Sequence, residues 1–229
     1  ITMGGKLPRQ EFLAPEIEGE NAAYLHGKED FNEKRIPWEF LTLRESPESC
    51  GINVSQRQGW LRIYGGNSLS SKYKQGVLAR RLQDNNCECI TKMEFVPKRY
   101  QHMAGLICYY NYDNYHYLRV TKDEESGRCI CVTSVNNREI TESEYVKISE
   151  DAEYYYLKAT IQGTNLEFSY SYDNQNFVKV GKNLDMRILS DEHVDGNGFT
   201  GAMVGMSCQD LQGDGCHADF DWFEYKTRI

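Results

Sequence analysis

The chain has 229 residues, enough for one large all-β domain with a short appendage or for two small domains. Its 16 Tyr, 9 Phe and 3 Trp argue against a disordered chain and suit the pleated surfaces of β-sheets. A formal charge of -8 with scattered Lys and Arg excludes a nucleic-acid partner, and no apolar run approaches the roughly 20 residues of a membrane span.

Residues 1–28 contain Gly4, Gly5, Pro8, Pro15 and Gly19 and show no clear periodicity. We interpret them as a linker or N-terminal extension, and we assign residues 29–229 to a single β-sandwich domain. Ile1 is an unusual native start and no signal-peptide pattern follows it, which suggests a fragment or a processed chain.

From Glu29 onward the pattern predicts strands separated by turns. An early strand near Phe40 should enter the core irregularly, because Pro37 interrupts it. Further strands are predicted at 60–64, 77–81, 87–96, 104–110, 115–122, 128–135, 154–162, 166–172 and 177–180. Turn signals recur about every 8 to 12 residues, which is typical of an all-β sandwich or barrel. One or two helical turns are expected at most, over 184–189.

The stretch from Gly196 to Tyr225 predicts the last two strands. Glycines such as Gly201 and Gly205 allow another backbone to approach closely. The segment from Ala218 to Lys226 carries aromatic residues on both of its sides, so we expect it near the middle of a sheet rather than at an edge.

Eight cysteines form an even set, but two of the pairs have Cys-x-Cys spacing within predicted strands, Cys87 with Cys89 and Cys129 with Cys131. Residues two apart in a strand point to the same face, so a disulfide within either pair is not expected. A zinc site built from the two pairs is one reading. We favour buried free thiols, because structural zinc usually takes Cys pairs on turns, and such thiols suit a reducing, cytoplasmic setting.

Motifs for nucleophilic catalysis, phosphate binding and zinc hydrolysis are missing, and the five histidines lie far apart in the sequence. Asp219 and Asp221 could form an acid and base pair, but their spacing on a strand favours a structural role. A structural calcium ion could join Asp219 or Asp221 to Glu29 or Asp30 if the first and last strands pair. We otherwise expect no metal site and no cofactor.

A group of tyrosines in the middle of the chain could face a sugar, since flat apolar sugar faces dock on aromatic rings. The candidates are Tyr109, Tyr110, Tyr112 and Tyr115. Because side chains alternate along strands, about half of these rings must belong to the core.

Four separated motifs occur in the same order as in a known family. They are EDFNEKRIPWEFLTLRESP, LRIYGGNSLSSKYKQGVLARRLQ, QHMAGLICYYNYDNYHYLRVTKDEESGR and GNGFTGAMVGMSCQDLQGDGCHADFDWFEY. Over about Glu29 to Tyr225 the chain resembles the C-terminal domain of glycoside hydrolase family 43 β-xylosidases and α-L-arabinofuranosidases. The resemblance implies a concanavalin A-like, jelly-roll β-sandwich of two antiparallel sheets.

In that family, hydrolysis of terminal xylose or arabinose is carried out by carboxylates of an N-terminal five-bladed propeller, so no catalytic residue can be transferred to this chain. The resemblance also implies that a loop after the A-R-R-x-Q motif inserts an aromatic residue into the pocket wall. Here the loop is Gln83, Asp84, Asn85 and Asn86, and Asn85 stands where the family has the aromatic. Asn85 is equally compatible with a polar contact to substrate and with a plain exposed turn.

Three classes of function follow. The first is a non-catalytic accessory domain that packs on a catalytic propeller and helps to wall its pocket, with a xylo- or arabino-oligosaccharide as the enzyme's ligand. The second is a free-standing, lectin-like carbohydrate-binding module. The third, an enzyme in its own right, depends on acidic residues alone. A homo-oligomer is compatible with each of the three.

Overall fold

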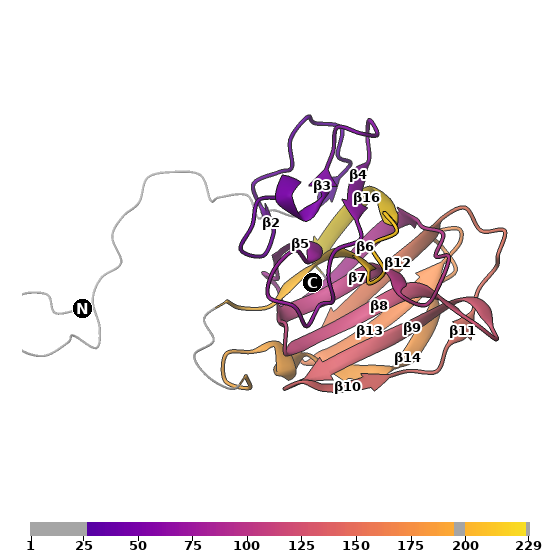
Figure 1. Ribbon diagram of the computed structural model, residues 1–229. Helices are drawn as coiled ribbons and strands as arrows, with labels where there is room; N and C mark the ends of the chain where they lie inside the picture. The colour runs from indigo at the N-terminus through magenta and orange to yellow at the C-terminus, as the bar shows by residue number, and fades with distance from the viewer. Residues whose placement is uncertain (1–26, 195–199, 228–229) are drawn as a thin grey trace, which may run out of the picture.

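The structure is a computed structural model that describes residues 27–194 and 200–227. Two antiparallel sheets of eight strands each lie face to face, which confirms the predicted all-β sandwich (Figure 1). The β16 sheet has the order β14 (Val178–Asp185), β13 (Asn165–Ser171), β12 (Tyr155–Gln162), β6 (Asn86–Glu94), β16 (His217–Thr227), β4 (Leu61–Tyr64) and β3 (Ile52–Asn53), and β1 (Gly27–Glu29) also pairs with β16. The β7 sheet has the order β10 (Glu139–Glu142), β9 (Gly127–Asn136), β8 (Asn114–Asp123), β7 (His102–Asn111), β15 (Met203–Asp210), β5 (Gly76–Arg81) and β2 (Phe40–Leu41), and β11 (Val146–Lys147) also pairs with β9.

Helix is limited, in the residues that the structure describes, to two 3₁₀ turns, η1 (Glu48–Cys50) and η2 (Met186–Leu189). The second lies within the segment where one or two helical turns were expected. In 27–194 and 200–227 there is no helix with the length and apolar character needed to cross a membrane.

The predicted strands and hairpins agree closely with the structure. β6 alternates as expected, with Cys87, Cys89 and Met93 fully buried between the sheets and Glu88 and Lys92 half-buried on the outer face. β7 pairs with β8, β9 with β10, and β12 with β13, each through a short connection. The turn residues therefore predicted which neighbouring strands pair.

The last strand lies inside its sheet, as its aromatic residues predicted. β16 is hydrogen-bonded to β6 on one side and to both β4 and β1 on the other. A register shift between Phe220 and Trp222 interrupts the strict alternation. Because of this irregularity, Phe220 and Phe223 both belong to the central core, although three positions separate them.

The expected close approach of backbones occurs at Gly205 on β15. A Cβ atom at this position would lie 2.2 Å from the carbonyl oxygen of Leu78 on β5. Glycine is therefore required where β15 and β5 pair, since no side chain fits into that space.

The apolar side chains form two cores. The larger core fills the space between the sheets and includes Leu106, Leu118 and Phe220. The smaller core lies on the outer face of the β7 sheet, where Leu69 and the half-buried Leu43 cover side chains of β5, β7, β8 and β9. The irregular stretches that contain Leu43 and Leu69 thus cover the outer face of the β7 sheet, and we call them the lid.

All eight cysteines are free, and seven of them are buried. Cys87 and Cys89 point into the central core from the β16 sheet. Cys129 and Cys131 alternate with the core residue Ile130 and so lie on the outer face of the β7 sheet. The two pairs point to different layers, which is incompatible with one zinc ion shared by both.

The first strand bears on the proposed linker. Gly27 and Lys28, which we placed at the end of the linker, form the first two positions of β1 and pair with Tyr225 and Glu224. Residues 1–26 lie outside the described residues, so the division of the chain at Glu29 stays a prediction.

Candidate functional site

The segment from Gln83 to Asn86 joins the two sheets at one end of the sandwich, which we call the turn end. It leaves β5 in the β7 sheet and enters β6 in the β16 sheet. The side chains of Gln83, Asn85 and Asn86 are exposed, and Asp84 is half-buried.

The hydroxyl group of Tyr225 binds this segment by hydrogen bonds. Its hydroxyl oxygen accepts hydrogen bonds from the backbone N–H groups of Gln83 and Asp84, at 3.0 Å each, and donates to Oδ2 of Asp84 at 3.0 Å. The guanidinium of Arg80 lies over the Tyr225 ring, 4.6 Å from its centroid, and donates to Oε1 of Gln83 at 2.9 Å. Four polar groups of the segment are therefore bound by two buried side chains, Tyr225 of β16 and Arg80 of β5.

A second set of bonds fixes the far side of the segment. The N–H of Gly163, in the β12–β13 turn, donates to the carbonyl oxygen of Asn85 at 2.8 Å and to Oδ1 of Asn86 at 3.0 Å. The segment is a fixed platform whose exposed groups are held in place before any partner arrives.

The first strand begins at the same end of the molecule. Gly27 pairs with Tyr225, whose hydroxyl binds the segment, so the chain enters the sandwich beside Gln83–Asn86.

Trp38 adds an apolar group to the turn end. It lies in a tight turn closed by a hydrogen bond of 3.1 Å from the Phe40 N–H to the Pro37 carbonyl oxygen, and 76% of its surface is exposed. β2 runs antiparallel to β5 with Phe40 opposite Arg80, so Trp38 lies beyond Arg80 toward the segment. Phe40, in contrast, is buried against Phe31 and Phe223.

The tyrosine platform does not form. Tyr109, Tyr110 and Tyr115 are 1%, 3% and 5% exposed, and only Tyr112 is half-buried. Alternation placed Tyr110 in the central core as anticipated, but Tyr109 and Tyr115 are covered by the lid that contains Leu69. The sugar-facing role predicted for these three rings is therefore wrong, because the outer face on which two of them lie is itself a core.

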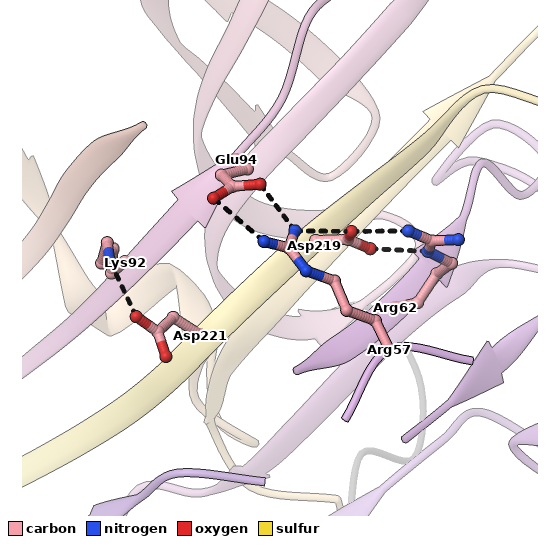
Figure 2. A network of polar contacts seen from close by, with 6 residues as sticks. All are labelled: Arg57, Arg62, Lys92, Glu94, Asp219 and Asp221. Atoms are coloured by element: carbon pink, nitrogen blue, oxygen red, sulfur yellow. Dashed lines mark hydrogen bonds and ion pairs between the residues drawn. The ribbon is translucent and has the colours of Figure 1, made fainter. Parts of the chain in front are cut away.

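Asp219 and Asp221 are bound by cations on the outer face of the β16 sheet (Figure 2). Arg62 donates two hydrogen bonds of 2.7 Å to Asp219, and Arg57 donates a third of 3.0 Å and also binds Glu94. Asp221 pairs with Nζ of Lys92 at 2.8 Å. Burial alone would raise the pKa of Asp219, but the bonds from Arg62 and Arg57 outweigh it and lower the pKa. A carboxylate held ionised in this way is a poor general acid.

The carboxylate oxygens of Asp219 and Asp221, which a calcium ion would need as ligands, are bound by these arginine and lysine side chains. The first and last strands do pair, as the calcium hypothesis required, but Glu29 accepts from the Phe31 N–H and Asp30 from the Asn32 N–H. Across the described ranges, no group of three or more His, Cys, Asp or Glu is placed to hold a metal ion. The acids of β16 are thus part of an ionic network that joins β4, β6 and β16.

Sequence reasoning missed Arg80, Tyr225 and Trp38. Tyr225 lies 142 residues from Gln83 along the chain, and no local pattern reports such a contact. Trp38 lies in the stretch near Phe40 that was expected to enter the core. The Pro37 next to it was the available signal, because a proline turn can swing one side chain of a run outward.

Comparison with known proteins agrees with this fold. Residues 28–226 match the family model of the β-xylosidase C-terminal concanavalin A-like domain. A putative β-xylosidase of Escherichia coli is 35% identical over 228 residues, covering 97% of this chain and 42% of that protein, and a β-xylosidase of Bacillus subtilis is 35% identical over 230 residues, covering 99% and 43%. The crystal structure of a xylan β-1,4-xylosidase from Bacillus halodurans superposes with a TM-score of 0.88 at 33% identity, covering 97% of this chain and 43% of that one. The chain thus spans about two fifths of the length of these relatives.

Proposed function

The chain belongs to the family of β-xylosidase C-terminal concanavalin A-like domains, and from that premise we propose that it is the non-catalytic accessory domain of a β-xylosidase-type glycoside hydrolase. Its partner is an N-terminal catalytic domain, for which the resemblance implies a five-bladed propeller. The observation that carries the proposal is that a chain matching the family throughout 28–226 covers only 42% to 43% of its relatives.

The turn end supports this docking role. The entry of the chain at β1, the fixed segment Gln83–Asn86 and the exposed Trp38 all lie there. Exposed tryptophan is the residue type most often found to carry binding energy at protein interfaces. A preorganised polar segment beside it provides a rim of hydrogen-bonding groups at little entropic cost.

Asn85 is the residue that we propose to complete the wall of a xylose or arabinose pocket. Its side chain is exposed, while its backbone carbonyl is bound by Gly163, so the amide is presented outward from a fixed base. An amide can both donate to and accept from sugar hydroxyls. The wall would then be polar where the family has an aromatic ring.

The chain alone is expected to hydrolyse neither aryl β-xyloside nor aryl arabinofuranoside, because Asp219 and Asp221 are ion-paired and the described residues form a β-sandwich rather than a catalytic propeller. Turnover that disappears with Asp219→Asn, in a variant that remains folded, would contradict the accessory role.

The pocket-wall role is tested in a chimera of the E. coli relative in which this chain replaces the matching 42% of that protein. Asn85→Phe should change the KM for aryl β-xyloside by about three- to tenfold, because it alters one wall of the pocket. Glu167→Gln, on an exposed surface pair with Lys179, is the matched control and should leave KM unchanged. Equal KM values for both variants and the parent would contradict the pocket-wall role.

A further inference from the structure

β15 and β16 come together at the end of the sandwich opposite the turn end. β15 starts beside Arg81 at the turn end and runs away from it to Asp210, and β16 begins at His217 after a short turn. Cys208 lies near the end of β15, and Cys216 directly precedes β16. Since β15 and β16 belong to different sheets, the two cysteines come from different layers of the sandwich.

Backbone hydrogen bonds bring these two cysteines to the same short piece of chain. The N–H of Gly65 donates to the Cys216 carbonyl oxygen at 2.7 Å, and the N–H of the next residue, Gly66, donates to the Cys208 carbonyl oxygen at 3.0 Å. The Cys216 N–H donates to Oδ2 of Asp210 at 3.0 Å, which fixes the turn between the strands. A Cβ atom at Gly65 would lie 2.3 Å from Cβ of Asp210, so this close approach requires glycine.

The side chains of the two cysteines also meet. Cys208 is 0% exposed within the central core, and the half-buried Cys216 packs against the same core. Burial raises the pKa of the Cys208 thiol, and the neighbouring thiol of Cys216 raises it further. The backbone N–H of Ala218 interacts with the same sulfur. The sulfur of Cys208 is therefore directed at the start of β16, beside the Cys216 thiol.

Cys216 is the accessible member of the pair. It lines a cavity of about 590 Å³ that opens at this end of the sandwich, while the other seven cysteines are buried. A thiol must be exposed to an oxidant before it reacts, so a reagent that enters the cavity meets Cys216 first. Cys208 lies next to it on the side away from solvent, which is the place of a second thiol that resolves the first oxidation product.

The charge of the cavity favours a neutral oxidant. Carboxylates outnumber cationic side chains among the residues that line it, and they include Glu94, Glu153 and Asp214. A bulky, negatively charged reagent such as glutathione disulfide is disfavoured there by like-charge repulsion. Hydrogen peroxide is small and uncharged, so it can reach a half-buried thiol beside these acids.

We propose that Cys208 and Cys216 form a reversible disulfide when the chain meets hydrogen peroxide. The thiolate of Cys216 attacks one peroxide oxygen, the O–O bond breaks, and the departing hydroxide takes up the proton that the thiol released, which leaves a sulfenic acid at Cys216 and one water. The sulfur of Cys208 then attacks the Cys216 sulfur, the S–O bond breaks, and a second water leaves with the proton of Cys208. Two thiols are thus oxidised to one disulfide while one peroxide is reduced to two waters.

The disulfide joins β15 of one sheet to β16 of the other. It lies remote from Gln83–Asn86 and uses residues of this chain alone, so it does not depend on the accessory role. The Cys-x-Cys pairs at 87–89 and 129–131 are 0% exposed, and peroxide should leave them reduced in the folded chain.

The test treats the reduced, folded 229-residue chain with hydrogen peroxide at about 1 mM and follows it by thiol titration after denaturation and by tryptic mapping. We expect the loss of two of the eight thiols. Cleavage after Arg187 and Lys226 gives a peptide, 188–226, that contains Cys208, Cys216 and no other cysteine. This peptide should lose the mass of two hydrogen atoms, and dithiothreitol should restore both thiols.

Three variants separate the two steps. Cys216→Ser removes the accessible thiol and should lose none of its remaining thiols to peroxide. Cys208→Ala removes the resolving thiol, so Cys216 should stop at the sulfenic acid and react with dimedone about tenfold more than in the parent. Cys50→Ala is the matched control, because Cys50 is the most exposed of the buried cysteines at 6%, and it should form the disulfide as the parent does.

The proposal is overturned if peptide 188–226 keeps both thiols after N-acetylcysteine in the same solution is consumed. It is also overturned if Cys216 of the parent accumulates as sulfenic or sulfinic acid without a disulfide, or if Cys216→Ser loses as many thiols as the parent. Should Cys208→Ala fail to fold, the peptide maps of the parent and of Cys216→Ser decide the matter. None of these outcomes affects the chimera's KM response at Asn85, so the two proposals fail separately.

Discussion

The two ends of the sandwich differ in the exposure and in the hydrogen bonding of their polar groups. At the turn end, the exposed segment Gln83–Asn86 has its backbone bonded to Tyr225 and Gly163, and what remains outward is side-chain amides and the ring of Trp38. At the opposite end, where β6 ends and β16 begins, charged groups such as Asp219 are buried and bonded to each other, while Nε2 of His102 has no hydrogen-bond partner among the described residues. The comparison teaches that exposure and incomplete bonding are separate properties. At the turn end the exposed segment has hydrogen bonds to its backbone groups, whereas at the opposite end a buried imidazole nitrogen has none from the described residues.

The largest effect on stability is expected at the ionic network around Asp219. Asp219→Asn should lower the free energy of unfolding by about 2 to 4 kcal/mol, because Arg62 and Arg57 would lose the carboxylate that joins them. The value falls below that of a fully buried pair because both arginines keep some contact with water. Urea unfolding measures the change, with Glu167→Gln as the exposed control. Equal losses in both variants would remove the distinction between buried and exposed charges.

The same variant should change the dependence of stability on pH. The pKa of Asp219 is lowered in the folded chain, so its contribution is present above the ordinary carboxyl pKa of about 4 and is lost as pH falls through the lower folded value. The parent should therefore lose stability more steeply than Asp219→Asn below about pH 4. Parallel curves for the two proteins would show that the network is not protonated over that range.

A smaller effect is expected at the bonds that complete the turn end. Tyr225→Phe removes the acceptor for the N–H groups of Gln83 and Asp84 and should cost about 1 to 3 kcal/mol. Amide exchange should quicken at those two residues more than in β6. The matched control is Tyr145→Phe, since that hydroxyl makes one exposed bond of 3.3 Å to Glu142. If exchange at Gln83 and Asp84 stays slow, Tyr225 is not what fixes the segment.

The smallest effect on stability is expected at Trp38. Trp38→Ser should change the free energy of unfolding by less than about 0.5 kcal/mol, because 76% of the side chain is already in water. Phe40→Ala, two residues away and 5% exposed, should cost about 3 kcal/mol or more. A loss of that size at Trp38 would mean that the ring supports the sandwich instead of being available to a partner.

Sequence alone predicted most of the strands, because alternation and turn residues are local signals. β6 shows the alternation expected from its sequence, and the β7–β8 hairpin forms at the expected turn. Gly205 lies where the backbones of β15 and β5 approach closely, as its glycine indicated. The register shift between Phe220 and Trp222 was not predictable, since a strict period of two gives no sign of an irregular position. The strand's central place followed from its aromatics all the same.

The candidate site was less accessible to sequence reasoning. The family resemblance located Gln83–Asn86, but the segment's rigidity depends on Tyr225, and that contact joins distant parts of the chain. The tyrosine platform failed because the lid over the β7 sheet has no periodic signal of its own, so nothing in the pattern showed that this outer face is covered. Contacts made by irregular segments are tertiary facts that alternation does not encode.

The central position of β16 also constrains the order of events during synthesis. β16 is the last strand of the described chain to leave the ribosome, yet it separates β6 from β4 and β1, so its sheet stays in three pieces until Thr227 has emerged. Until then β6 and β4 present unpaired edges to other nascent chains. Domains dominated by such distant pairings fold slowly. We therefore expect this sheet to complete its pairing only after β16 has emerged, with chaperones most relevant in the interval before that strand is inserted.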